Sequence, residues 1–181
     1  QRQMCIRDRK WITNRYDHTR TDLSCLPDFK SPAISQVILE NTRMELAKME
    51  FKTPTIEDKE EIDRCILADD TRSCDYATAN IILWSAYYQV KYVIIEGLFV
   101  SHTDEEGGSF CYPIGKGDKK KVLQSLMDDC KEKQIPFVLH GVTHEMEDEF
   151  REMFGDIYEI EYDRDISEYI YDREKLATLS G

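Results

Sequence analysis

The chain has 181 residues, enough for one domain or for one domain with a tail. Hydrophobic residues make up 41% of it and charged residues 33%, which argues against an intrinsically disordered protein. No apolar run approaches the roughly 20 residues of a membrane helix, and a net charge of -12 repels nucleic-acid phosphates. We therefore expect no membrane span and no DNA partner.

The cysteines and the first residues bear on the cellular compartment. Six cysteines are spaced too far apart for a C-x-x-C pair, which disfavours a zinc ribbon or a thioredoxin-like motif. The first residues carry charge and lack the apolar stretch of a signal peptide. These features predict a cytoplasmic protein whose thiols are reduced and buried.

Residues 1–48 differ in composition from the rest of the chain. They hold nine Lys/Arg and six Asp/Glu, whereas residues 49–181 hold fifteen and thirty. The opening string Q-R-Q-M-C-I-R-D-R resembles a translated sequencing adaptor, and Met49 begins a pattern that reads as a natural start. We interpret residues 1–48 as a non-native or disordered extension, with Met44 as the other candidate start. A genuine regulatory extension is the alternative.

The first predicted elements after Met49 are two helices. Thr55 is a helix-start signal followed by acidic residues, and an apolar stripe continues to Leu67. Ser73 or Asp75 is expected to cap a second helix with its body at residues 78–88. Aromatic and polar side chains share one face of that helix at four-residue spacing: Tyr76, Asn80, Trp84 and Tyr88.

The pattern then alternates between strands and helices. Residues 89–112 predict an antiparallel meander, with Glu96-Gly97 as the first turn. Asp118 and Thr143 are predicted to cap two further helices, on either side of a buried strand at 137–139. Strands at 158–162 and 169–171 and a helix from Arg173 complete the order. The fold class is therefore α/β (α+β), with a mixed, largely antiparallel sheet flanked by helices.

Four spaced segments carry a family resemblance. They are M-E-F-K-T-P-T-I-E-D-K-E, S-C-D-Y-A-T-A-N-I-I-L-W, Y-P-I-G-K-G-D and D-R-E-K-L-A-T-L-S-G. In this order they resemble the bacterial family allied to the C-terminal region of phosphatidylglycerol lysyltransferase, over nearly all of residues 49–181. The resemblance implies two tandem GNAT-like folds, of which this chain would supply the first. The missing second repeat would be its partner, and acyl-CoA or aminoacyl-tRNA would be the donor.

Two groups of residues are candidates for substrate binding. Gly115, Lys116 and Gly117 precede a helix, where free N–H groups can meet an anion. The loop departs from the R/Q-x-x-G-x-G/A pattern of CoA-binding loops, so a plain turn followed by the Asp118 cap is the alternative. The face of Tyr76, Asn80, Trp84 and Tyr88, with Arg72 and Asp75 near its start, is the second candidate; the alternative is an aromatic core.

No metal site or catalytic set is predicted. His140 and His144 are separated by Gly141 and a strand-to-helix break, so they do not share a helix face as metal ligands would. The sequence supports two function classes. One is half of an acyl- or aminoacyltransferase that is inactive alone, with a small-molecule acceptor. The other is a non-catalytic binding or scaffold module on the same fold.

Overall fold

A computed structural model describes residues 5–14, 49–69, 71, 73–103, 108–170 and 172–178. Helices and strands alternate through the chain. In order, they are β1 (Cys5–Asn14), η1 (Ile56–Asp58), α2 (Lys59–Ile66), η2 (Cys74–Tyr76), α3 (Thr78–Trp84), β2 (Lys91–Ile95), β3 (Leu98–Thr103), β4 (Ser109–Cys111), β5 (Ile114–Gly115), α4 (Lys119–Lys133), β6 (Val138–Val142), α5 (His144–Phe154), β7 (Tyr158–Ile170) and α6 (Arg173–Thr178).

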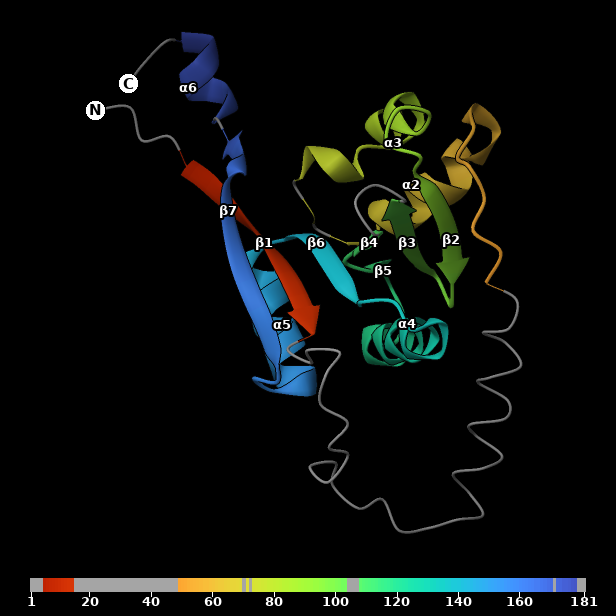
Figure 1. Cartoon of the computed structure of the whole chain (residues 1–181). Coiled ribbons are helices and arrows are strands. Elements are labelled where there is room, and N and C mark those ends of the chain that lie inside the picture. The colour runs from red at the N-terminus through yellow and green to blue at the C-terminus, as the bar shows by residue number, and fades with distance from the viewer. Residues whose placement is uncertain are drawn as a thin grey trace.

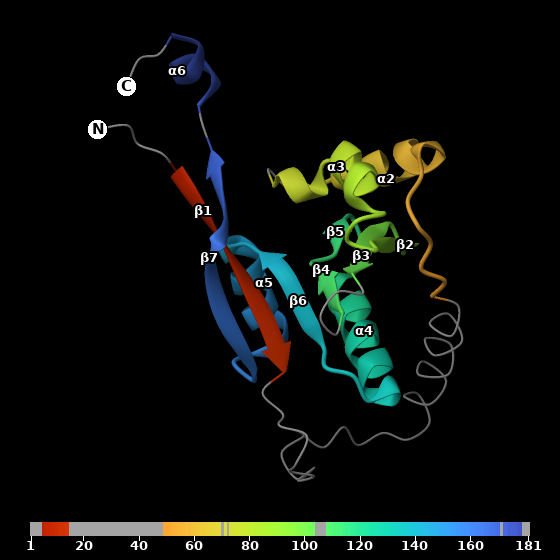
Figure 2. The same ribbon diagram turned by 45° about the horizontal axis from the view of Figure 1, so that its top comes forward.

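One seven-stranded sheet forms the centre of the molecule. Its strand order is β2-β3-β4-β6-β1-β7, with β5 paired to β3. All pairs are antiparallel except β4 with β6, which is parallel. Helices α2 and α3 lie on one side of the β2–β3–β4 strands and α4 lies on the other, with α5 beside β1 and β7 (Figures 1 and 2). The predicted α/β class is confirmed, and the architecture is GNAT-like.

Local sequence signals explain the main elements. The hairpin of β2 and β3 turns at Glu96 and Gly97, whose φ angles of 51° and 80° suit a two-residue turn between twisted strands. The Asp118 side chain accepts from the N–H of Lys121 at the start of α4, and Thr143 accepts from the N–H of Met146 at the start of α5. These caps lie where the sequence places them.

Two predicted boundaries are wrong. The second helix ends at Trp84 rather than Tyr88, where the Ser85 hydroxyl bonds the Ile82 carbonyl. The chain then turns and takes a positive φ of 50° at Gln89. The two strands expected at 158–162 and 169–171 form one strand, β7, because β1 pairs with it along almost its whole length.

Strand β1 lies inside the segment interpreted as an extension. It pairs with both β6 and β7, and the Ile12 side chain between them is fully buried. Residues 5–14 therefore form a strand within the segment that we interpreted as a non-native or disordered extension. Residues 15–48 lie outside the described residues, and whether residues 1–48 are native stays a prediction.

Candidate functional site

The parallel strands β4 and β6 separate after a short contact. They pair at Phe110 with Leu139 and at Cys111 with His140. Beyond this point the chain from β4 enters β5, which pairs with β3, while β6 continues and pairs with β1. The split gives the sheet a place where backbone polar groups need partners other than a neighbouring strand.

Two tyrosines occupy this split. Tyr76 is buried, and its hydroxyl donates to the backbone carbonyl of Tyr112 at 3.1 Å. Tyr112 is also buried, and its hydroxyl donates to Oε2 of Glu149 on α5 at 3.0 Å. Burial, followed by the charge of Glu149, holds the pKa of Tyr112 well above its ordinary value. The polar groups at the split are thus bonded within the chain.

The Gly115–Gly117 loop packs its backbone against the hairpin turn. A Cβ at Gly115 would lie 2.4 Å from the Gly97 carbonyl oxygen, and one at Gly117 would lie 2.6 Å from that of Glu96. The N–H of Gly115 donates to Oδ2 of Asp69 at 3.3 Å. The glycines therefore permit a close backbone contact, and a carboxylate of this chain already accepts from the loop. This geometry favours the turn-and-cap interpretation.

Lys119, at the start of α4, lies among two carboxylates and a ring. Its Nζ is 3.2 Å from Oδ2 of Asp69, 3.3 Å from Oε2 of Glu149 and 5.5 Å from the centre of the Tyr112 ring. Only 17% of the lysine side chain is exposed. Sequence reasoning did not find these contacts, because the partners of Lys119 come from other elements.

The predicted aromatic face does not exist as a single face. Tyr76 belongs to η2, and Ala77 takes an extended conformation before α3 begins, which breaks the helical spacing. Tyr76 is buried, whereas Trp84 is 52% and Tyr88 40% exposed. Their rings form an exposed cluster with Tyr87, with centres 4.8 to 6.2 Å apart.

The polar members of that prediction are also separated. The Asn80 side chain donates to the carbonyl of Cys74, the first residue of η2, at 2.9 Å. Asp75 is exposed and lies near Gly141, where an added Cβ would be 3.9 Å from its Oδ2. Arg72 lies outside the described residues. Substrate binding by these residues stays a prediction.

The two histidines considered as metal ligands have separate partners. Nδ1 of His140 lies 2.9 Å from the Ser109 hydroxyl, and Nδ1 of His144 lies 4.0 Å from Glu147. Within the described part of the chain, no cluster of three or more His, Cys, Asp or Glu is arranged to hold a metal ion. None of the described helices is long and apolar enough to cross a membrane.

Comparisons with known proteins agree with this fold. A solved structure of a conserved protein of unknown function from Bacteroides thetaiotaomicron is 30% identical, with a TM-score of 0.68. The match covers 72% of this chain and 45% of that protein, so this chain spans less than half its length. None of the curated proteins matches. The family model described as "Phosphatidylglycerol lysyltransferase, C-terminal" matches residues 70–181. The chain belongs to this family.

Proposed function

We propose that this chain is the first GNAT-like half of an acyl- or aminoacyltransferase. The match of the lysyltransferase family model to residues 70–181 carries the proposal. The length of the Bacteroides relative supports it, because that protein has room for a second domain of similar size. The free thiols at Cys65, Cys111 and Cys130 are consistent with a cytoplasmic location.

The reaction places a donor ester or thioester beside an acceptor. The acceptor's amine or hydroxyl attacks the acyl carbon, a new C–N or C–O bond forms, and the old C–O or C–S bond breaks. The acceptor's proton passes to the leaving oxygen or sulfur. Such an enzyme needs hydrogen-bond donors aimed at the developing negative charge. Here Gly115 and Lys119 are bonded to Asp69, so we propose that this half is inactive alone.

Transfer assays test this proposal. The 181-residue chain and the complete product of its source gene are each incubated with labelled acetyl-CoA and with labelled lysyl-tRNA. We expect the complete product to consume one donor and the 181-residue chain to consume neither. Inertness of the complete product toward both donors, or turnover by this chain alone, contradicts the proposal.

A second candidate is a non-catalytic binding or scaffold module. The hydrogen bond from the Tyr76 hydroxyl to the Tyr112 carbonyl favours this second function, because the bond fills the place where β4 and β6 separate. A thermal-shift panel with CoA esters, nucleotides and amino acids discriminates between the candidates, since a ligand of the native state raises the melting temperature. Stabilisation by a ligand that is not a transfer donor, with an inert complete product, would favour this second function.

A further inference from the structure

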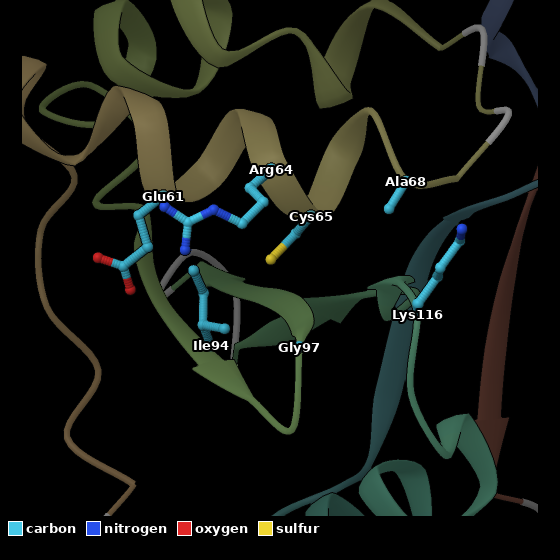
Figure 3. Close-up of a pocket in the computed structure, with 7 residues that line it drawn as sticks. All are labelled: Glu61, Arg64, Cys65, Ala68, Ile94, Gly97 and Lys116. Atoms are coloured by element: carbon cyan, nitrogen blue, oxygen red, sulfur yellow. The ribbon is translucent and has the colours of Figure 1, made fainter.

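A pocket of about 470 Å³ lies between helix α2 and the turn of the β2–β3 hairpin (Figure 3). Glu61, Arg64 and Cys65 line it from α2, and Ala68 lines it from the turn that follows the helix. Ile94 lines it from β2 and Lys116 from the loop before α4. The volume lies in the usual range for small-molecule sites, about 300 to 1,000 Å³.

The inner surface of the pocket is apolar. Cys65 is buried with 6% of its surface exposed, and Ala68 and Ile94 are half-buried. Gly97 keeps the hairpin turn against the neighbouring loop, because a Cβ there would lie 2.8 Å from the Lys116 carbonyl oxygen. A short alkyl chain could therefore replace water on this surface at a favourable free energy.

Two cationic side chains border this apolar surface. Figure 3 shows Arg64 and Lys116 at opposite ends of the pocket. Neither makes an ion pair or a hydrogen bond within the described residues, whereas Lys52, Lys119 and Lys121 each contact a carboxylate.

The acidic residue that lines the pocket does not cancel both cations. Oε2 of Glu61 lies 3.8 Å from the Nζ of Lys52, which offsets part of its negative charge. The pocket therefore keeps an excess of positive charge in a chain whose net charge is -12. Cations left without a carboxylate at the ends of an apolar pocket are complementary to an anionic ligand.

We propose that this pocket binds a small organic anion with a short alkyl chain. The anionic group, a carboxylate or a phosphate, pairs with Arg64 or Lys116, and the chain lies against Cys65, Ala68 and Ile94. The proposal does not rest on transferase activity, because neither cation belongs to the strand split or to the Lys119 contacts.

Amide chemical shifts of the ¹⁵N-labelled 181-residue chain test the proposal. Four probes are titrated: hexanoate, hexyl phosphate, hexyltrimethylammonium and inorganic phosphate. We expect hexanoate or hexyl phosphate to shift the amides of Cys65, Ala68, Ile94 and Gly97 in a saturable manner, and the stronger of the two identifies the anionic group. Hexyltrimethylammonium has the alkyl chain but not the negative charge, and inorganic phosphate has the negative charge but not the alkyl chain. Both should therefore bind at least about tenfold more weakly than the better organic anion.

Charge-reversal variants provide the matched control. Arg64→Glu with Lys116→Glu should weaken binding about tenfold or more, while Lys131→Glu with Lys175→Glu, on exposed helix positions, makes the same change in net charge and should leave binding unaltered. All four positions are exposed, and the spectrum itself reports whether each variant is folded. The proposal is overturned if neither organic anion shifts the pocket amides, if the cation or inorganic phosphate binds equally well, or if both double variants bind alike.

Discussion

Tyr112 connects three parts of the fold through a single residue. Its carbonyl accepts from Tyr76, its hydroxyl donates to Glu149, and its ring lies beneath the Lys119 ammonium. The side chain is fully buried, so its hydroxyl depends on Glu149 for a partner. A hydrogen bond from a buried neutral donor to a charged acceptor is among the stronger ones in proteins.

Removing this hydroxyl should destabilise the protein. Tyr112→Phe loses the bond to Glu149, and we expect the free energy of unfolding in urea to fall by about 1 to 2 kcal/mol. Tyr87→Phe is the matched control, because Tyr87 is 70% exposed and should change stability by less than about 0.5 kcal/mol. Equal effects of the two substitutions would show that the Tyr112 hydroxyl contributes nothing specific.

The buried thiols should resist alkylation in the folded protein. Burial raises the pKa of Cys130 to about 11 and also raises the pKa values of Cys65 and Cys111, so little thiolate forms at pH 8. Iodoacetamide should therefore modify the exposed Cys74 well before these three, as peptide mass spectrometry would show. Prompt labelling of Cys130 in folded protein would contradict the burial described here.

The same shift has a consequence for stability at alkaline pH. The folded pKa of Cys130 lies above the unfolded value of about 8.5, so the folded state favours the protonated thiol. The contribution of this thiol to the free energy of unfolding is fully present below about pH 8.5 and is lost progressively as the pH rises toward 11. Cys130→Ser should therefore show a smaller loss of stability over this range than the unchanged protein.

At the scale of elements, the hairpin turn and the loop before α4 form a unit of contacting backbones. Gly97 and Gly115 have φ angles of 80° and 130°. A Cβ on either residue would collide with the backbone of the other segment. Glycine is needed here for conformation and for space. The contact also positions Lys116 and the N–H of Gly115.

A substitution at this contact should cost more than one at a glycine with room around it. Gly115→Ala combines a positive φ with a 2.4 Å contact, and we expect a loss of about 3 kcal/mol or more. Gly155→Ala has a φ of 73° but no atom within 4 Å of the new Cβ, so about 1 kcal/mol is expected. Chemical denaturation measures both. Similar losses for the two substitutions would mean that the positive φ angle, and not the close backbone contact, determines the loss of stability.

The start of η1 depends on one carboxylate. Asp58 accepts from the N–H of Thr55 at 2.8 Å and pairs with Lys52 at 2.7 Å, and the lysine is the main cause that holds its pKa below the ordinary value. A lowered pKa gives stability that is present above about pH 4 and is lost as the pH falls. Asp58→Asn should thus cost about 1 kcal/mol at pH 7, and the difference in the free energy of urea unfolding should shrink progressively as the pH falls below about 4. A pH-independent difference would contradict this assignment.

At the scale of the whole molecule, β1 fills the position between β6 and β7. Ile12 is fully buried there, and Ile12→Ala should lower the free energy of unfolding by roughly 2 to 4 kcal/mol. Ile157→Ala, at a position 55% exposed, serves as the control and should have a small effect. If the two substitutions cost the same, β1 does not contribute its side chains to the core.

The origin of residues 1–48 is a separate question for the whole chain. Our prediction from the sequence is that translation starts at Met49, in which case peptides from residues 10–40 should be absent from the native protein. Mass spectrometry of protein isolated from its source checks this directly. A native peptide from that range would show that β1 belongs to the natural fold.

The sequence by itself determined the features that depend on near neighbours. The caps at Asp118 and Thr143, the turn at Glu96-Gly97 and the order of elements after Met49 are local, because each depends on side chains and backbone groups within a few residues. The motifs also indicated the family.

Only the tertiary structure decided which distant segments meet. The pairing of β1 with β6 and β7, the contacts of Lys119, and the bond from Tyr112 to Glu149, 37 residues away, leave no periodic signal. The break at Ala77 separated Tyr76 from Trp84, and the pocket between α2 and the hairpin brought together Arg64 and Lys116. These contacts depend on how the layers pack, and packing is set by the whole chain rather than by any one window of it.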